Sequence, residues 1–514
     1  MYELRGSYPA RERPRKLLQF PPQFGPTEPT RESLERDLRA LARTPWVEGV
    51  MFRADGLSLD LSTAYALRKL LGILRDADKT SRVYLGNLDT ASYYFASGAD
   101  EVVMPESGEL FVLGVGLEQF YLRDLLDRLG VGVDVLAVRD YKTAFEPLAR
   151  REMSEAQREQ YGRFLESVSA TFRQGVARRR EVTADEVQGW LEHPPISATQ
   201  ARDLGMIDTV AYEDELIGTD DKPFASVARL LLAPRRAPSK RVAVVSLEGV
   251  IVTGSSRRSP LPVPLVGEQA GSDTLVRALR QAAQDPQTGA IVLYVDSGGG
   301  SALASDLIGR EVMRARQHKP VVAVMGSVAA SGGYYVLTHA NVVMAAPTTL
   351  TGSIGVVVGK PVLEEAFGRY GVSSERLEPY PFALAFSASY PFDDKQRDWL
   401  ERYTDDVYQR FVARVAAGRG LSRDDVDALG RGRIWSGTDA LERGLIDELG
   451  DLPAAIARAK QLADLPGSAP VYNVRAPSKL ILPTRDDPST LLRSLAPLQR
   501  ERTLLLCPSL YSVR

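Results

Sequence analysis

The chain repeats itself at a nearly constant spacing, and this repeat restricts the folds open to its 514 residues more than any other feature. Four segments recur in the same order. SEAQREQYGRF recurs as DDKQRDWLERY after 396 − 157 = 239 residues, and ISATQARDLGMID recurs as WSGTDALERGLID after 436 − 197 = 239. VEGVMFRAD recurs as TGAIVLYVD after 289 − 49 = 240 residues, and YYFASGADEVVM recurs as YYVLTHANVVM after 334 − 93 = 241. One such pair could arise by chance, but four in one order indicate a tandem duplication.

The repeat divides the sequence into five predicted segments. They are an N-terminal extension (1–45) with a short amphipathic helix behind Thr30, an N-terminal repeat (46–215), a Pro-rich linker (216–239), a C-terminal repeat (240–465) and a Pro-rich C-terminal extension (466–514). Short apolar runs such as AIVLYV and VVAVMG alternate with helical stretches in each repeat. This alternation predicts an α/β fold with a largely parallel sheet.

Composition excludes several classes of function. Lys plus Arg minus Asp plus Glu is 64 − 66 = −2, so no basic field favours nucleic acid. One cysteine and three histidines predict no intrachain disulfide and no metal site built on Cys or His. No cofactor is expected either. The first residues are charged and turn-rich, without an apolar run of signal-peptide or anchor length. The sequence therefore predicts a protein in the cytoplasm or peripheral to a membrane.

Three glycine-rich turns follow strands in the second half: DSGGGS from Asp296, GSVAASGGYY from Gly326, and TGSIG from Thr351. A turn of this kind presents backbone N–H groups that can bind a phosphate or an oxyanion. In the second turn Ser331 begins a helix among small residues, which leaves its hydroxyl uncrowded. Each turn taken alone is a weak signal, because glycines also close tight connections and Ser331 could equally be a helix cap.

Together with Tyr141-Lys142-Thr143-Ala144-Phe145-Glu146-Pro147, these turns resemble the signal peptide peptidase A family in its long, tandem form. The resemblance covers about 46–465 and implies two tandem domains of the ClpP/crotonase fold, built of repeated ββα units. It also implies that Ser331 is the nucleophile, that Lys142 is the general base, and that Ser353 orients the lysine amine. The first turn departs from the family pattern, with Asp296 and Gly298 where Asn and Pro are usual.

The repeat tests this assignment independently. Lys142 shifted by 239 falls on 142 + 239 = 381, which is Pro381. The first-half counterpart of GSVAASGGYY is GNLDTASYY from Gly86, which is one residue shorter and has no Ser-Gly-Gly. Each half thus retains what the other has lost. A single site assembled from both halves explains this pattern, whereas two independent sites do not.

The chemistry sets further expectations for these residues. A lysine acts as a base only when uncharged, so its pKa must fall well below about 10.4, and burial away from carboxylates achieves this. Glu146 is therefore expected to face away from Lys142. The developing oxyanion needs two N–H donors, and we expect one from Gly332 and the second from Gly299 or Gly300.

Three alternatives compete with the serine–lysine peptidase. A Ser-His-Asp triad is disfavoured because none of His193, His318 and His339 is well placed relative to the serine. A crotonase-like acyl-CoA enzyme, or a non-catalytic scaffold of degenerate repeats, leaves the complementary loss unexplained. The leading prediction is a peptidase of short, mainly apolar peptides such as cleaved signal peptides, with peptide substrates as partners. By the same resemblance, we expect a homotetramer.

Overall fold

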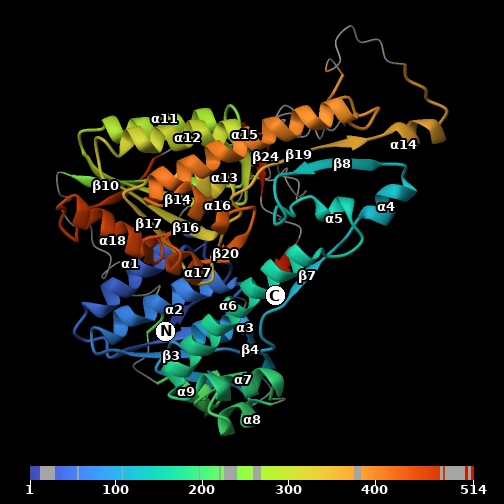
Figure 1. Ribbon diagram of the computed structural model, residues 1–514. Helices are drawn as coiled ribbons and strands as arrows, with labels where there is room; N and C mark the ends of the chain where they lie inside the picture. Colours follow the sequence, from blue (N-terminus) through green and yellow to red (C-terminus); the bar gives the residue numbers. More distant parts are fainter. Residues whose placement is uncertain are drawn as a thin grey trace. The chain divides into compact units, whose positions relative to one another are not determined.

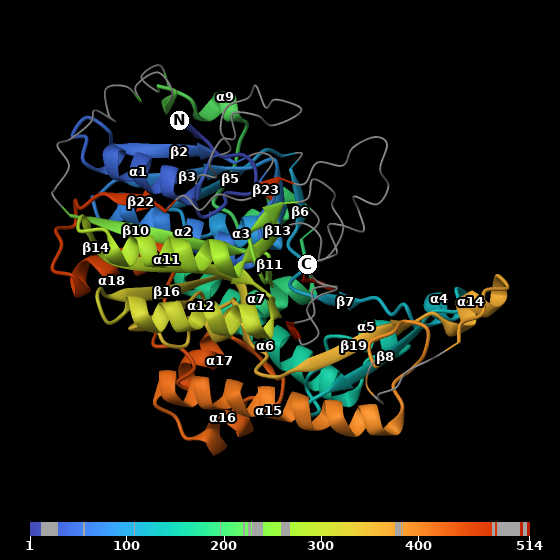
Figure 2. The ribbon, with the colours of Figure 1, turned by 90° about the horizontal axis from the view of Figure 1, so that it is seen from above.

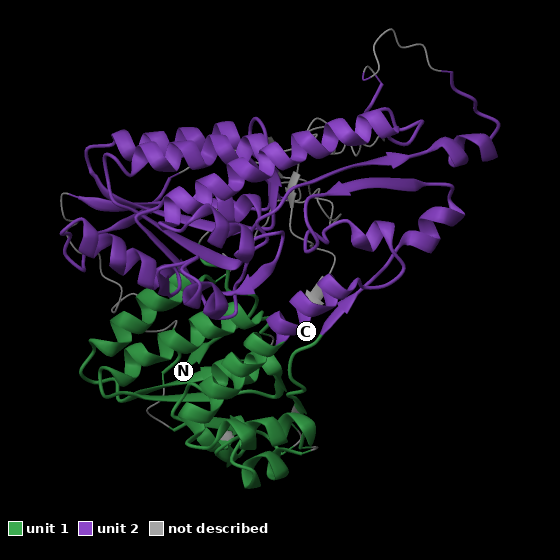
Figure 3. Cartoon of the chain, viewed as in Figure 1, with its two compact units in different colours: residues 1–116, 166–237, 514 green, residues 117–165, 238–513 purple. Residues whose placement is uncertain are grey.

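The computed structural model describes residues 1–11, 29–54, 57–106, 108–195, 197–218, 222–224, 228, 240–258, 268–375, 382, 384–474, 479–480, 504–506 and 511–513. The chain forms two compact units (Figure 3): unit 1 comprises 1–116, 166–237 and 514, and unit 2 comprises 117–165 and 238–513. These units differ from the predicted segments, because 117–165 of the first repeat belongs to unit 2. Most of the predicted linker and of the C-terminal extension lies outside the described residues.

Unit 1 is built on a parallel five-stranded sheet of order β1-β2-β3-β5-β9. Its elements are β1 (Tyr2–Glu3), α1 (Arg31–Ala42), β2 (Gly49–Arg53), α2 (Leu61–Arg75), β3 (Thr80–Tyr84), β4 (Asn87–Asp89), α3 (Thr90–Ala96), β5 (Glu101–Met104), β6 (Glu109–Phe111), α7 (Ala184–Glu192), α8 (Ala198–Asp203), β9 (Thr209–Val210) and α9 (Glu213–Leu216). A capping box at Thr30 begins α1, whose Leu34, Leu38 and Leu41 are buried in the core of this unit.

Unit 2 contains a central sheet of order β20-β18-β16-β14-β10-β22, with β17 beside β16 and β21 beside β17. Its strands are β10 (Arg241–Glu248), β14 (Thr288–Ser297), β16 (Val321–Ala330), β17 (Val342–Ala345), β18 (Leu350–Gly352), β20 (Ile434–Ser436), β21 (Glu448–Leu449) and β22 (Val471–Asn473). The runs AIVLYV and VVAVM are buried throughout, as expected for parallel strands covered on both faces. Figure 1 shows α11 (Ser272–Gln284) and α12 (Ala302–Ala315) on one side of this sheet and α18 (Leu452–Leu462) on the other.

A second sheet of unit 2 has the order β23-β12-β13-β11-β15-β24-β19-β8. Its strands are β8 (Gly132–Ala137), β11 (Val250–Val252), β12 (Arg257–Arg258), β13 (Glu268–Gly271), β15 (Gly299–Ser301), β19 (Val357–Val362), β23 (Lys479–Leu480) and β24 (Leu504–Leu506). The remaining elements of the chain are β7 (Leu117–Gln119), α4 (Arg123–Arg128), α5 (Glu146–Ala149), α6 (Glu155–Arg180), α13 (Gly332–Leu337), α14 (Glu364–Arg369), α15 (Asp394–Arg419), α16 (Arg423–Leu429), α17 (Gly437–Glu442) and β25 (Tyr511–Val513). They belong to unit 2, except that residues 166–180 of α6 belong to unit 1. The antiparallel β8–β19 pair places the segment before Lys142 in unit 2.

The duplication is visible in the secondary structure. The 26-residue helices α6 and α15 begin 394 − 155 = 239 residues apart. The shift is also 239 between α7 and α16, between α8 and α17, and between β9 and β21. The prediction of a tandem α/β fold is confirmed, although the compact units do not follow the repeat boundaries.

Candidate active site

Ser331 lies at a sharp turn between the end of β16 and the start of α13. Its backbone has φ 55° and ψ −117°, a conformation that costs a non-glycine residue about 1–3 kcal/mol. The turn is held because the Ser331 N–H donates to the carbonyl of Gly352, at 2.8 Å. The side chain is buried. The sheet thus fixes Ser331 in a conformation that a free loop would not retain.

Glycine is required after Ser331 because two turns meet there. A Cβ on Gly333 would lie 2.4 Å from the carbonyl oxygen of Ser297. A Cβ on Gly332 would lie 3.2 Å from both the Cα of Gly299 and the backbone nitrogen of Gly300. The first and second glycine-rich turns of the sequence are therefore in contact at the serine, as the parallel β14 and β16 require.

Lys142 reaches the same place from the loop after β8. Its Nζ lies 2.8 Å from Ser331 Oγ, 3.0 Å from Ser353 Oγ and 3.0 Å from the Ser353 carbonyl oxygen. The Lys142 side chain is only 4% exposed, and both serines are buried. The structure thus brings together the three residues that the resemblance selected. All of them lie in unit 2.

The loop that carries Lys142 is held by backbone hydrogen bonds to the strand and turn beside it. The N–H of Val138 donates to the carbonyl of Val356 at 3.0 Å, and the N–H of Tyr141 donates to that of Arg431 at 3.1 Å. The buried Gln160 links this loop to β20: its amide group donates to Thr143 Oγ1 at 2.9 Å and accepts from the Ile434 N–H at 3.2 Å. The sequence analysis missed Gln160, whose amphipathic helical context gave no signal of this role.

Two glycines also make room for the lysine. A Cβ on Gly432, which has φ +86°, would lie 2.4 Å from the Lys142 backbone nitrogen. A Cβ on Gly355 would lie 3.1 Å from Lys142 Cδ. Gly355 belongs to the TGSIG turn singled out in the sequence, whereas Gly432 carried no sequence signal, because the contact joins residues 290 apart (432 − 142).

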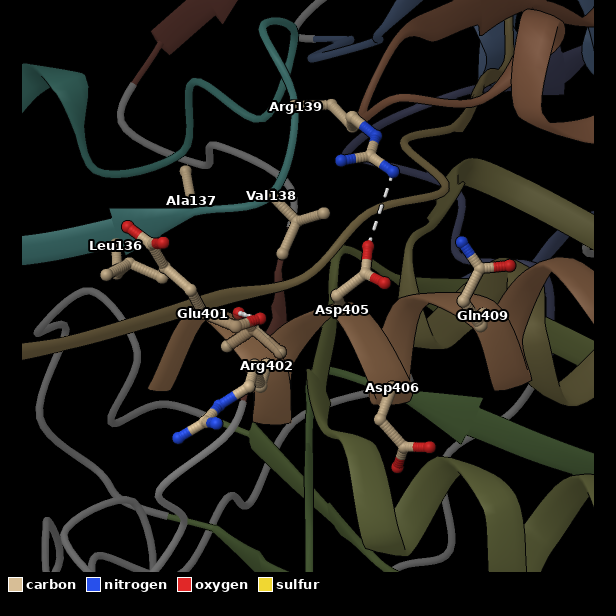
Figure 4. Close-up of a pocket in the computed structure, with 10 residues that line it drawn as sticks. Leu136, Ala137, Val138, Arg139, Glu401, Arg402, Asp405, Asp406 and Gln409 are labelled. Carbon is tan, nitrogen blue, oxygen red and sulfur yellow. Dashed lines mark hydrogen bonds and ion pairs between the residues drawn. The ribbon is translucent and has the colours of Figure 1, made fainter. Parts of the chain in front are cut away.

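A charged network supports the same loop from outside. Figure 4 shows Arg139 in a pocket lined by residues of β8, the following loop and α15. The Arg139 guanidinium donates to the carboxylate of Asp405 on α15 at 3.3 Å. The guanidinium also lies over the ring of Tyr408, 5.5 Å from its centroid. The Tyr408 hydroxyl accepts the N–H of Arg431, whose carbonyl holds the Lys142 loop. Arg139 therefore joins the loop to α15 and helps to fix it.

The candidate oxyanion donors are close together but not equivalent. The Gly299 N–H donates to Ser297 Oγ at 3.1 Å and is thereby engaged in the turn. Gly300, with φ +157°, lies against β11, and a Cβ there would be 2.0 Å from the carbonyl oxygen of Ile251. A substitution at Gly300 would disturb the sheet itself, so it cannot isolate an effect on the oxyanion.

Two acidic residues noted in the sequence have structural partners. The Asp296 carboxylate accepts the N–H of Val328 at 3.1 Å, and it also receives the Tyr294 hydroxyl at 3.3 Å. The Glu146 carboxylate accepts the N–H of Ser154 at 3.4 Å. Asp296 thus ties β14 to β16 immediately before the serine turn.

His339, a competing candidate base, is buried just beyond the end of α13. Its Nδ1 would lie 3.2 Å from a Cβ on Gly418, and its Nε2 has no hydrogen-bond partner among the described residues. Burial, with the nearby Arg414 and Arg316, lowers the pKa of His339. The imidazole is therefore kept neutral inside the fold.

This burial predicts a pH-dependent stability. Below about pH 6.5, the ordinary pKa of histidine, the unfolded chain binds a proton that the native His339 does not. The free energy of unfolding should therefore decrease as the pH falls through this value. Urea unfolding at pH 7.5 and 5.5 measures the effect, with His339→Gln as the comparison because it retains every other titrating group. An equal loss of stability in both proteins would contradict the prediction.

A buried serine with a lysine amine at hydrogen-bond distance, beside glycine turns at the ends of parallel strands, is the arrangement in which an amine can activate a hydroxyl nucleophile. Comparison with known proteins gives the family of the chain. The model of peptidase family S49 matches residues 73–223 and 313–466, two segments that start 313 − 73 = 240 residues apart. The chain belongs to peptidase family S49.

Individual relatives cover most of this chain. Protease 4 of Haemophilus influenzae is 32% identical over 76% of this chain and 66% of its own length. Protease 4 of Salmonella typhi is 30% identical over 77% and 66%, and the chloroplastic serine protease SPPA of Arabidopsis thaliana is 28% identical over 83% and 64%. The chain thus spans about two thirds of the length of these curated relatives. Among solved structures, a mutant of the 1510-N membrane-bound stomatin-specific protease is 15% identical and covers 48% of this chain and 100% of its own, with a TM-score of 0.28.

Two further features concern the described residues as a whole. No helix in the described part of the chain combines the length and apolar character needed to cross a membrane. Within the same residues, His, Cys, Asp and Glu side chains form no group of three or more suited to a metal ion.

Proposed function

We propose that this chain is a serine peptidase in which Ser331 is the nucleophile and Lys142 the general base, and that it hydrolyses short, mainly apolar peptides such as cleaved signal peptides. The observation that carries the proposal is the distance of 2.8 Å between Lys142 Nζ and Ser331 Oγ in a buried site. Membership of peptidase family S49 and the relatives named as proteases support it.

The hydrogen-bond pattern suits an uncharged amine. A neutral lysine has two N–H hydrogens and one lone pair. The carbonyl and hydroxyl oxygens of Ser353, each 3.0 Å from Nζ, can accept the two hydrogens. The lone pair is then directed at the Ser331 hydroxyl. Burial favours this neutral form over the ammonium.

The reaction proceeds in two stages. In the first, Ser331 Oγ bonds to the peptide carbonyl carbon while Lys142 Nζ takes the hydroxyl proton. The C–N bond then breaks, Nζ gives that proton to the leaving amine, and an ester remains on Ser331. In the second, Nζ takes a proton from water, the hydroxide attacks the ester carbon, and the proton passes to Ser331 Oγ as the carboxylic acid leaves.

Negative charge develops on the carbonyl oxygen in both stages and needs donors that are already in place. We assign the first donor to the N–H of Gly332, next to the nucleophile. We assign the second to the N–H of Gly300, because the Gly299 N–H is engaged by Ser297 Oγ. Gly299 then shapes the turn that brings its neighbour to the serine.

The preference for apolar peptides is supported by the helix that follows β15. Leu303 and Leu307 on α12 are 60% and 40% exposed. They are four residues apart, so they lie on one face of α12. This face begins two residues after the glycine turn and offers an apolar surface to a bound side chain.

We extend the proposal to a homotetramer, which would act on its peptides in free solution or at a membrane surface. Figures 1 and 2 show α4 and α14 at the far end of the β8–β19 pair. Leu125 and Leu129 on and after α4, and Tyr370 after α14, are 52%, 54% and 85% exposed. Apolar side chains gathered at the end of an arm suit contact with a second copy of the chain.

A serine-reactive phosphonate tests the function directly. The wild-type protein should bind one probe per chain, and the mass shift should fall on the peptide that contains Ser331. Ser331→Ala should remain unlabelled. A fluorogenic apolar peptide should be cleaved faster than a peptide of the same length with acidic side chains. Labelling of another serine, or turnover of acyl-CoA thioesters in place of peptides, would overturn the proposal.

A further inference from the structure

The second sheet of unit 2 is continuous only through a strand from far along the chain. Strand β24 (Leu504–Leu506) pairs antiparallel with β15 on one side and with β19 on the other. Among the described strands, β15 otherwise pairs with β11, and β19 with β8. Without β24 the sheet would therefore have two facing edges, separated by the width of one strand. Two such edges form a slot for an extended peptide, which can pair with both.

Both walls of this slot lead to the candidate active site. The β15 wall contains Gly299 and Gly300, which lie against Gly332, the residue after the nucleophile. The β19 wall begins at Val357, two residues after Gly355, which contacts the Lys142 side chain. In the slot, Leu506 is the register partner of Gly299, and Leu505 that of Gly300. The end of β24 therefore lies at the turn that meets the serine.

The segment is also held beyond the slot. Strand β25 (Tyr511–Val513) pairs antiparallel with β7 (Leu117–Gln119) in the same unit. Three consecutive leucines are, moreover, a sequence of the apolar kind expected for the substrate. The occupant of the slot thus combines a suitable composition with a permanent covalent connection to the chain.

We propose that residues 504–506 of this chain occupy the peptide-binding slot between β15 and β19 and compete with substrate as a tethered inhibitor. This inference rests on the proposed peptidase function. A tethered strand and a free peptide cannot both pair with β15 and β19. If the slot is open for about one tenth of the time, the apparent KM is raised about tenfold, because only the open fraction binds substrate. The maximal rate is unaffected, because saturating substrate displaces the strand.

Leu505→Pro in the full-length chain tests this competition. Proline has no N–H and is poorly accepted inside a sheet, so it should release β24. We expect the KM for an apolar peptide to fall about tenfold, with kcat within about twofold of wild type. Leu480→Pro is the matched control, because it places proline in β23, another strand of the same extension that pairs with neither β15 nor β19. Its KM should equal that of the wild-type protein.

Two further measurements keep the outcomes distinct. A synthetic peptide of residues 501–506 should inhibit Leu505→Pro about tenfold more strongly than wild type. The phosphonate should label Ser331 faster in Leu505→Pro when substrate is absent. Equal KM and equal labelling rates would overturn the inference alone, whereas no labelling of Ser331 in either protein would overturn the proposed function. If the wild-type protein cleaves off its own residues 504–506 and Ser331→Ala does not, the segment is a substrate. That result would also overturn the inference.

Discussion

Ser331→Ala and Lys142→Ala should each lower kcat/KM for peptide hydrolysis by about 10⁴-fold or more, and the double variant should lose little beyond either single one. Nucleophile and base act as one unit, because Nζ takes the proton that makes Oγ reactive across the 2.8 Å that separates them. Initial rates on a fluorogenic peptide measure the effect, and unfolding curves show that the fold is retained. We expect the two losses to be equal within about tenfold.

Lys319→Ala is the control for the removal of a lysine. In the wild-type protein, Lys319 lies in the connection between α12 and β16, and its Nζ donates to the backbone carbonyls of Ala282 and Asp285. Its removal should lower stability and leave the rate unchanged. More than about a tenth of wild-type activity in Lys142→Ala would contradict the dyad. A pH–rate profile governed by a group near pH 6.5, and abolished by replacing a histidine, would also contradict it.

Gly432→Val should lower kcat/KM by about 100-fold, although residue 432 touches no substrate in the proposed mechanism. A Cβ there would lie 2.4 Å from the Lys142 nitrogen and 2.6 Å from its Cα, so the lysine loop must move. A displacement of about 1 Å is enough to cost this factor when the reacting atoms depend on hydrogen-bond contact. Steady-state kinetics and the rate of Ser331 labelling should fall together.

Gly371→Val separates this displacement from backbone strain. Gly371 has φ +72°, close to the +86° of Gly432, but a Cβ there would have no atom within 4 Å. Both variants therefore carry a similar cost of placing a side chain at positive φ, and only Gly432→Val collides with the lysine loop. Rates within about threefold of each other in the two variants would show that position 432 does not position Lys142.

The sequence predicted the α/β class and the duplication because both depend on patterns that are local along the chain. Apolar runs such as AIVLYV alternate with helical stretches, and the shift of 239 residues survives in helices as long as α6 and α15. The sequence also predicts the pairing of Ser331 with Lys142, because the duplication exposes which half has lost each group. Their chemical roles remain proposals.

Contacts between distant residues could not be predicted in this way. Gln160 and Gly432 act on the lysine loop only because β8 pairs with β19 and places 117–165 in unit 2, a boundary that the repeat does not mark. Likewise, the engagement of the Gly299 N–H by Ser297 Oγ depends on the turn geometry. The position of Leu504–Leu506 between β15 and β19 depends on its pairing with the edges of both strands. The sequence alone therefore determined the fold class, the duplication and the choice of the serine and the lysine. Only the tertiary structure decided which residues hold the lysine loop and which segment fills the slot. The reason is that backbone pairing between remote segments leaves no periodic signal in the residues that form it.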